Sequence, residues 1–404
     1  MALLKQLVPH VTIARMLTRE QFLKNLPGAV LAVSPLVSGQ LSAQQGPAIR
    51  KRNSAADRSD ALSAQAAAGA KVDGWSHAIP KAYMDRLTAL PPGPHSPVLK
   101  ILMSVPSLFD MDLRFRTMDR FGNYTQVLTP MPGLHLNLAM GDRKLAGELV
   151  RFSNDGLAEF VTKYPDRFKG FAGLLPMYDP DQALIELDRV MKLGALGVQI
   201  ETSVNGVPLD DPRFEPLFAR MADLERPIWI HPVRSPLSPD YASEKASRFA
   251  ISTALGWPYE TSVCLARLVF CGHLERHPKL RIIAHHGGGM IPHFSGRLGH
   301  YLETWGPKMD AELGTALQSL KKPLLDYFRM FYVDTALNGA KQAVACVVEF
   351  FGPEHVLFGT DTPFDPEEGR FVQDTIADVE SLAAGQSTQR RIFNDNALRV
   401  LRIR

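Results

Sequence analysis

The sequence is poor in cysteine and in long apolar runs, and each shortage excludes a class of protein. Its 404 residues include three cysteines, Cys264, Cys271 and Cys346, and no CxxC pair, so no disulfide framework is expected. The 45 Lys and Arg nearly balance the 42 Asp and Glu, and both signs are mixed along the chain. We therefore expect neither a nucleic-acid-binding surface nor an acidic tail. No apolar run is long enough for a permanent membrane span.

The first 69 residues differ in composition from the rest. Lys and Arg residues precede a small, mostly apolar run at 26–37, and small residues follow up to a cleavage point expected after Ala43. This order is typical of an export signal, so residues 1–43 are interpreted as a signal-like segment, with a flexible extension or an early start codon as the alternative. Glu20 stands where a twin-arginine signal has its second arginine. Residues 44–69 are polar and rich in Ala and Ser, which predicts a flexible linker. The protein is expected in the periplasm if the signal is used, and in the cytoplasm otherwise.

From residue 70 to residue 404, apolar, β-branched runs alternate with amphipathic stretches. The runs expected to form strands are residues 71–79, 124–131, 168–177, 194–202, 226–233, 279–287, 330–337 and 355–364. Apolar strands that alternate with helices indicate a parallel sheet covered by helices. Eight such units predict an α/β fold of the (β/α)8 TIM-barrel type. A doubly wound open sheet is the alternative, but VDGWSH at the first strand lacks the GxGxxG turn of that fold.

Polar side chains come at or just after the ends of several predicted strands. They are His77, His231, His285, His286, Asp334 and Asp361. In a barrel the carboxyl ends of all strands meet at one face, where active sites of this fold lie. One such histidine alone would more often be structural, but several on one rim indicate a metal or acid–base site.

Imidazole and carboxylate groups without thiolate favour a divalent metal, with Zn²⁺ first and Mn²⁺ or Fe²⁺ as alternatives. His77, His231 and Asp361 form a three-ligand set that would leave positions open for water or substrate. His286 then remains as the candidate general acid or base.

Three further side chains are candidates for substrate binding. Arg297 could hold a substrate carboxylate through two hydrogen bonds, or it could form an ordinary surface salt bridge. Trp257 could form the wall of an aromatic pocket, or it could pack in the core. Trp75 lies two residues before His77, where a metal enzyme could use another ligand.

A series of motifs resembles a known family across the predicted barrel. The motifs are MDRFGNYTQVLTPMP, YPDRFKGFAGLLPM, DQALIELDRVMKLGALGVQI, NGVPLDD, RPIWIHP, GWPYETS, HPKLRIIAHHGGGMIPHFSGR, HVLFGTDTPF and NDNALRV. In this order they resemble the amidohydrolase-related family that includes aminocarboxymuconate-semialdehyde decarboxylase and the resorcylate, vanillate-type and salicylate-type decarboxylases. The resemblance implies a TIM barrel of the metal-dependent hydrolase type.

The resemblance also implies roles for individual residues. His77, His231 and Asp361 match metal ligands of the family, and His286 matches its catalytic histidine. The family's first strand ends in HxH or ExH with both outer residues on the metal, and Trp75 departs from this pattern. Arg297 matches an arginine that can reach a neighbouring subunit's site, which implies a homodimer.

The activity implied is non-oxidative decarboxylation of a small aromatic or unsaturated carboxylic acid, with a divalent metal and no organic cofactor. Two alternatives remain open at this point. The same rim of residues could activate water against an amide, lactone or ester. Because of Trp75, the barrel could also have lost its metal and act as a binding protein.

Overall fold

The computed structural model describes residues 69–93, 95–133, 138, 141–365 and 367–403. The signal-like segment and nearly all of the predicted linker lie in residues 1–68, outside the described residues. Within the described part of the chain, no helix combines the length and apolarity needed to cross a membrane.

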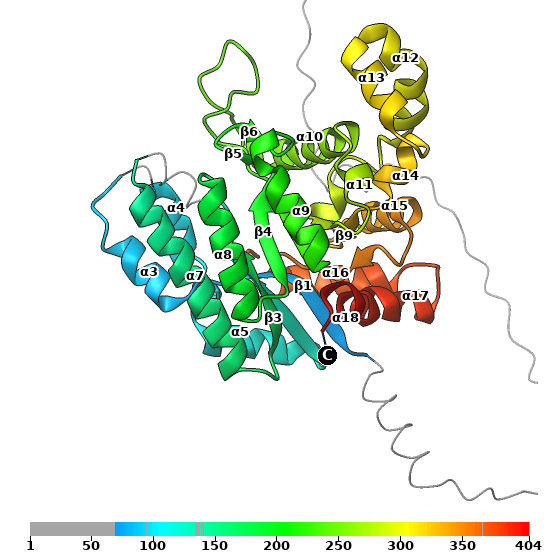
Figure 1. The fold of residues 1–404 in the computed structure, drawn as a ribbon. Coiled ribbons are helices and arrows are strands. Elements are labelled where there is room, and N and C mark those ends of the chain that lie inside the picture. The colour runs from blue at the N-terminus through cyan, green and yellow to red at the C-terminus, as the bar shows by residue number, and fades with distance from the viewer. Residues whose placement is uncertain (1–68, 94, 134–137, 139–140, 366, 404) are drawn as a thin grey trace, which may run out of the picture. The chain divides into compact units, whose positions relative to one another are not determined.

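Eight parallel strands form one sheet whose spatial order follows the chain (Figure 1). They are β1 (Lys71–His77), β2 (Tyr124–Thr129), β3 (Phe168–Leu174), β4 (Gly197–Glu201), β7 (Pro227–His231), β8 (Arg281–Ala284), β9 (Tyr332–Asp334) and β10 (Val356–Leu357). Each lies within one of the predicted runs. A short antiparallel hairpin of β5 (Ser203–Val204) and β6 (Val207–Pro208), which the strand pattern did not predict, follows β4.

The segment after β10 returns to β1 and closes the ring. The backbone N–H of Gly74 donates to the carbonyl of Phe358 at 2.8 Å, and that of His77 donates to Thr362 at 2.8 Å. Ser76 and Thr362 form a parallel bridge. These bonds make a barrel of the sheet and confirm the predicted (β/α)8 fold.

Most helices lie around the outside of the sheet, and the pair at residues 302–319 projects away from it (Figure 1). They are α3 (Lys81–Thr88), α4 (Ser96–Met103), α5 (Met111–Met118), α7 (Arg143–Lys163), α8 (Pro180–Lys192), α9 (Glu215–Leu224), α10 (Trp257–Phe270), α11 (His273–Arg276), α12 (Leu302–Met309), α13 (Ala311–Ser319), α14 (Leu324–Phe328), α15 (Lys341–Phe351), α16 (Arg370–Glu380), α17 (Gln386–Arg390) and α18 (Asn396–Leu401). Asp142 and Asp179 show why two of them begin where they do, since their carboxylates accept from the backbone N–H groups of Leu145 and Gln182. Such caps satisfy donors that a helix leaves free at its first turn.

The interior of the barrel is filled by bulky side chains. Trp75 and Trp229 lie there with Val127, Ile283 and Leu357, and all five are buried. α18 adds Leu401 to this cluster. The indole of Trp229 donates to the carbonyl of Gly74 at 3.1 Å, so its polar atom is satisfied despite full burial.

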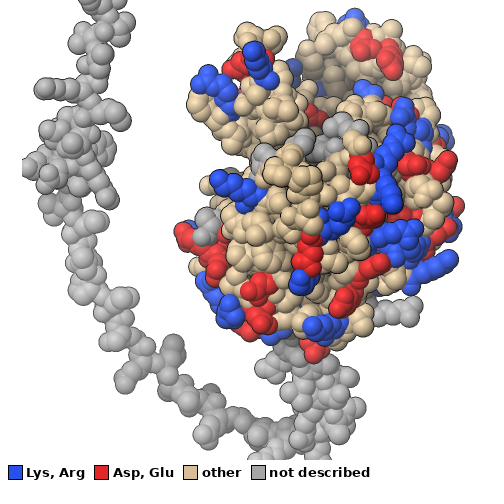
Figure 2. All heavy atoms as spheres, turned by 90° about the vertical axis from the view of Figure 1, so that its left-hand side faces the viewer, with Lys and Arg blue, Asp and Glu red and all other residues tan. Residues whose placement is uncertain are grey.

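The outer surface carries both signs of charge. On the face drawn in Figure 2, Lys and Arg side chains alternate with Asp and Glu side chains over the described atoms. A surface mixed in this way produces no extended field of one sign. This face of the molecule therefore presents no patch of a single charge.

Candidate active site

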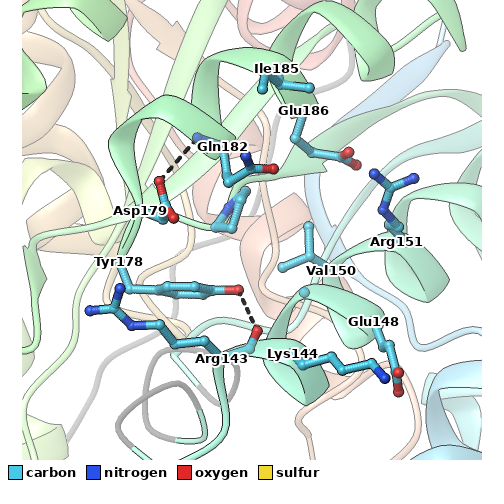
Figure 3. A pocket seen from close by; sticks show the side chains of 12 residues that line it. Arg143, Lys144, Glu148, Val150, Arg151, Tyr178, Asp179, Gln182, Ile185 and Glu186 are labelled. Atoms are coloured by element: carbon cyan, nitrogen blue, oxygen red, sulfur yellow. Dashed lines mark hydrogen bonds between the residues drawn. The ribbon is translucent and has the colours of Figure 1, made fainter.

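A groove on the outside of the barrel contains charged groups but none of the predicted site residues (Figure 3). It has a volume of about 440 Å³ and lies between α7 and α8. Its carboxylates have structural partners, since Asp179 caps α8 and Glu186 accepts from Asn154 and Arg189. The carboxylates of Asp179 and Glu186 are therefore occupied by structural contacts.

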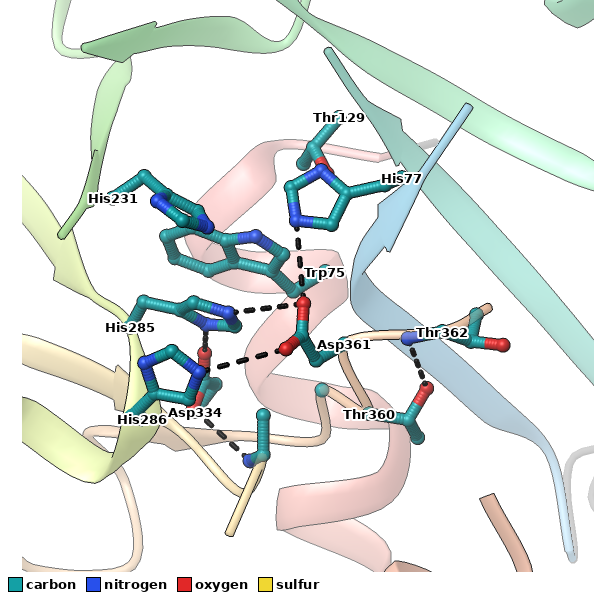
Figure 4. A network of polar contacts seen from close by, with 12 residues as sticks. Trp75, His77, Thr129, His231, His285, His286, Asp334, Thr360, Asp361 and Thr362 are labelled. Atoms are coloured by element: carbon teal, nitrogen blue, oxygen red, sulfur yellow. Dashed lines mark hydrogen bonds and ion pairs between the residues drawn. The ribbon is translucent and has the colours of Figure 1, made fainter. Parts of the chain in front are cut away.

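The ends of five strands bring together the predicted histidines and aspartates (Figure 4). The carboxylate of Asp361 lies at their centre. Its Oδ1 is 3.3 Å from Nε2 of His77 and 3.3 Å from Nε2 of His285, and its Oδ2 is 3.5 Å from Nε2 of His286. One ring nitrogen from each of His77, His231 and His285 also lies within 4.8 Å of the others.

Backbone carbonyls fix the tautomers of two of these histidines. Nδ1 of His77 is 3.0 Å from the carbonyl of Pro130, and Nδ1 of His231 is 2.7 Å from the carbonyl of Pro232. A carbonyl only accepts, so each Nδ1 carries the proton and each Nε2 keeps its lone pair. Nε2 of His77 and Nε2 of His285 are buried without a hydrogen-bond partner. Unpartnered ring nitrogens that converge beside a carboxylate fit a divalent metal of the zinc or manganese type.

Two of the site residues have a left-handed backbone. His286 has φ of 52° and Asp361 has φ of 58°. This conformation costs a non-glycine residue of order 1 kcal/mol or more and is concentrated at functional sites. Both residues direct their side chains into the cluster, where Nε2 of His286 meets Oδ2 of Asp361.

Electrostatics divide the histidines into two kinds. Burial and the charge of His285 lower the pKa of both His231 and His286, so both rings are neutral at neutral pH. Burial would also lower the pKa of His285, but the carboxylates of Asp334 and Asp361 outweigh it and raise the pKa to about 9. Burial would raise the pKa of Asp361, but the charge of His285 and the close approach of the other histidine rings hold it well below its usual range. The site therefore provides an ionised carboxylate among imidazole rings.

Aromatic rings surround the cluster. Trp257, at the start of α10, has its ring centroid 5.4 Å from that of His231 and 6.2 Å from that of His286. Phe364 lies 5.6 Å from the ring of His77. Trp75 stacks on His285 at 3.8 Å with an interplanar angle of 15°. Trp75 and Trp257 thus lie at the site, and Phe364 is a neighbour that the sequence did not single out.

Arg297 does not join this cluster within the chain. It is exposed, and its guanidinium lies over the ring of Tyr301 at 5.0 Å from the ring centroid. Among the described residues it has no carboxylate within ion-pair distance, which argues against the surface salt bridge. A contact between Arg297 and this chain's own substrate has no support in the structure.

Sequence reasoning gave no role to three buried residues of the rim. His285 and Asp334 were noted only as strand ends, yet they hydrogen-bond through Nδ1 of His285 and a carboxylate oxygen. Glu201, the last residue of β4, is fully buried, accepts from the N–H of Gly133 at 2.8 Å and leaves its second oxygen unpartnered. Its position at a strand end, within QIET, was the signal that could have identified it.

A family model and two curated decarboxylases are similar to this chain. A family model described as amidohydrolase matches residues 72–403. Gamma-resorcylate decarboxylase of Rhizobium radiobacter is 32% identical over 297 residues, which cover 70% of this chain and 86% of that protein. The 2-amino-3-carboxymuconate-6-semialdehyde decarboxylase of Dictyostelium discoideum is 29% identical over 295 residues, 72% of this chain and 77% of that protein.

A solved structure shows the same similarity in three dimensions. Dihydroxybenzoic acid decarboxylase of a Polaromonas species, with bound manganese and the inhibitor 2-nitroresorcinol, has a TM-score of 0.65 and 28% identity, and the match covers 83% of this chain and 97% of that one. The chain therefore belongs to the amidohydrolase family, which confirms the family that its motifs predicted.

Proposed function

We propose that this protein is a metal-dependent, non-oxidative decarboxylase of a small phenolic or otherwise unsaturated carboxylic acid. The observation that carries the proposal is the convergence of His77, His231, His286 and Asp361 on one face of the barrel, in a chain 32% identical to a gamma-resorcylate decarboxylase. No organic cofactor is proposed, because a ring protonated at the carbon that bears the carboxylate can itself accept the electron pair of the broken carbon–carbon bond.

Metal binding is assigned to His77, His231 and Asp361: His77 has ring nitrogens close to both His231 and the Asp361 carboxylate. When bound, a divalent cation would act as a Lewis acid for the substrate's oxygens. Zinc was the first expectation from the donor types, and the similar Polaromonas structure holds manganese. Both ions, with Fe²⁺ as a third, suit nitrogen and carboxylate donors.

His286 is assigned the proton transfer. Its Nε2 faces Asp361, and its Nδ1 is buried without a partner. Decarboxylation of an aromatic acid requires a proton at the ring carbon that bears the carboxylate. The carbon–carbon bond then breaks, its electron pair stays with the ring, and CO₂ leaves. A neutral histidine hydrogen-bonded to a carboxylate can accept a proton and deliver it again near neutral pH.

The aromatic side chains beside the cluster favour a flat substrate. Trp257 and Phe364 approach the ligand histidines from different elements and could enclose an aromatic ring. The gamma-resorcylate decarboxylase relative acts on a hydroxylated benzoate by its name. We therefore place 2,6-dihydroxybenzoate, which is gamma-resorcylate, first in the substrate panel.

The test measures CO₂ release by purified protein that has been loaded with Mn²⁺ or Zn²⁺. His286→Ala should lower kcat by about 10²-fold or more with metal content unchanged, because it removes the proton donor and no proposed ligand. His293→Ala is the matched control, since His293 is exposed on the loop that follows the site. Turnover of lactones, esters or anilides without CO₂ release would replace the proposal by a hydrolase. Metal content below about a tenth of an equivalent would instead support a metal-free binding protein.

We also propose that the protein is a homodimer. Large apolar side chains are exposed at the C-terminal face on two segments: Leu237, Tyr241, Phe249, Leu255 and Tyr259 on one, and Phe294, Tyr301, Trp305 and Met309 on the other. Exposed apolar surface of this extent often marks an interface. Arg297 lies within the second segment, from which it could reach a partner's substrate.

Light scattering should give twice the chain mass, and Trp305→Glu should shift the protein toward monomer. Arg297→Ala should raise KM and leave the mass of the particle unchanged. A monomeric wild type would overturn the dimer proposal.

A further inference from the structure

Trp75 occupies a position where the resembling family has a metal ligand. An indole N–H is only a donor and cannot bind a metal. The Trp75 side chain is completely buried, and its N–H has no hydrogen-bond partner. Its face is stacked on the ring of His285 at 3.8 Å, so the residue that replaces a ligand lies directly against another histidine (Figure 4).

His285 has the features of a metal ligand. It directly follows β8, and its side chain is completely buried. Its Nε2 has no hydrogen-bond partner and lies 3.3 Å from Asp361, and it can share an ion with His77 and His231.

Asp334 supplies the support that ligand histidines usually have. Its carboxylate accepts from Nδ1 of His285 and also from the backbone N–H groups of Gly287 at 3.1 Å and Ala336 at 3.0 Å. A histidine that binds a metal through one nitrogen almost always donates its other N–H to a carboxylate or a carbonyl. Asp334 therefore fixes both the tautomer and the orientation of His285.

We propose that His285 supplies the metal ligand that Trp75 cannot, so that the ligand has moved from β1 to the end of β8 and the metal is held by His77, His231, His285 and Asp361. The inference rests on the proposed metal site and deepens it. Asp334 positions His285, and Trp75 holds the His285 ring in place by stacking.

Gly359 supports this arrangement. A Cβ atom at position 359 would lie 2.9 Å from Cβ of Asp334 and 3.3 Å from Cβ of Trp75. The missing side chain therefore lets the indole and the aspartate pack side by side around His285. Trp75 and Asp334 thus both contact His285, one through ring stacking and the other through a hydrogen bond.

A competing interpretation assigns His285 no metal role. A protonated His285 between Asp334 and Asp361 would simply join two carboxylates across the barrel. The two interpretations differ in what happens to metal affinity when His285 is removed, so they can be separated without an activity measurement.

The experiment measures Mn²⁺ and Zn²⁺ affinity by competition with a chelator, together with the visible absorption of the Co²⁺-loaded protein. His285→Ala should weaken affinity by about 10²-fold or more and change the Co²⁺ spectrum, because a nitrogen donor is lost. Asp334→Asn, which keeps His285, should weaken affinity by roughly 10- to 100-fold. This second variant keeps the test decisive if His285→Ala fails to fold. His293→Ala is the control and should match wild type.

The double variant Trp75→His/His285→Ala tests the movement of the ligand directly. Recovery of most of the lost metal affinity would show that a histidine on β1 can replace the histidine after β8 as a metal ligand. Unchanged affinity in both His285→Ala and Asp334→Asn, together with loss of affinity in His231→Ala, would overturn this inference and leave the proposed decarboxylase intact. A wild-type protein that binds no metal would overturn both.

Discussion

Glu201 gives a pH-dependent contribution to stability at the scale of a single residue. Burial raises the pKa of this carboxyl to about 7, because hydrogen bonds from the backbone only partly offset its lost hydration. Between its ordinary pKa of 4.5 and about 7, the folded protein keeps a proton that the unfolded chain releases. This contribution to the free energy of unfolding is therefore fully present below pH 4.5. Above pH 4.5 it falls by about 1.4 kcal/mol per pH unit, until the pH passes about 7 and the folded protein also loses the proton.

Glu201→Gln should remove this part of the pH dependence. The amide oxygen can still accept from Gly133, and the group carries no charge at any pH. Urea unfolding at pH 5 and pH 8, with metal content held fixed, should show a smaller loss of stability in the variant than in wild type. Equal losses in the two proteins would mean that Glu201 is ionised in the folded state at both pH values.

For the histidine pair after β8, the sequence predicts the location of the two residues but not the contacts of their rings. The sequence placed His285 and His286 together at the end of a strand, and the structure brings both to the site. Which ring enters the barrel depends on where β8 ends, at Ala284, and on the left-handed backbone of His286. Strand periodicity carries no information on that turn, so the contacts of His285 with Asp334 and Trp75 could not be foreseen.

At the scale of elements, Asp73 holds together the two ends of the sheet. Its buried carboxylate accepts from the hydroxyl of Tyr124 on β2, from the N–H and hydroxyl of Thr360 after β10, and from the N–H of Trp75. β1 and β2 shift register between Asp73 and Ser76, which indicates a bulge in β1. Asp73 thus joins β1, β2 and the β10 segment at the point where the ring closes.

Asp73→Ala should lower the free energy of unfolding by about 3–5 kcal/mol, since several buried donors lose their acceptor at once. Asp223→Ala, at an exposed position of α9, should change it by no more than about 0.5 kcal/mol. Denaturant unfolding of both variants beside wild type provides the comparison. A small effect at Asp73 would show that water or local rearrangement satisfies these donors.

Element order could be predicted from the sequence better than element bounds. Each of the eight apolar runs contains a strand, because buried parallel strands need continuous apolar residues. Two amphipathic stretches are divided in the structure, which the alternation of strands and helices does not predict. After β7, the left-handed backbone of Gly272 separates α10 from α11. After β10, a π-helical turn at Arg391–Asp395 precedes α18. The bulge in β1 depends on pairing across the sheet, which a local pattern does not contain.

At the scale of the whole molecule, the proposed ligands meet at one site but come from different strands of the barrel. His77 ends β1, His231 ends β7, and His285 and Asp361 follow β8 and β10. In the sequence, His77 lies near the start of the barrel and Asp361 lies near its end. An ion held by all of them links the first and last strands to the middle of the sheet, so metal binding should be coupled to global stability.

Chelation should therefore lower the melting temperature by several degrees, and the loss should depend on free metal concentration. Binding to the folded state alone contributes about 2.7 kcal/mol at a free metal concentration one hundred times Kd. His231→Ala should melt at the same temperature with and without added Mn²⁺, because the affinity is gone, whereas His286→Ala should keep the full metal-dependent rise. Scanning calorimetry over a series of buffered metal concentrations measures both. If chelation leaves the wild-type melting temperature unchanged, the cluster does not bind a metal across the barrel, and the histidines hold the rim together through Asp361 alone.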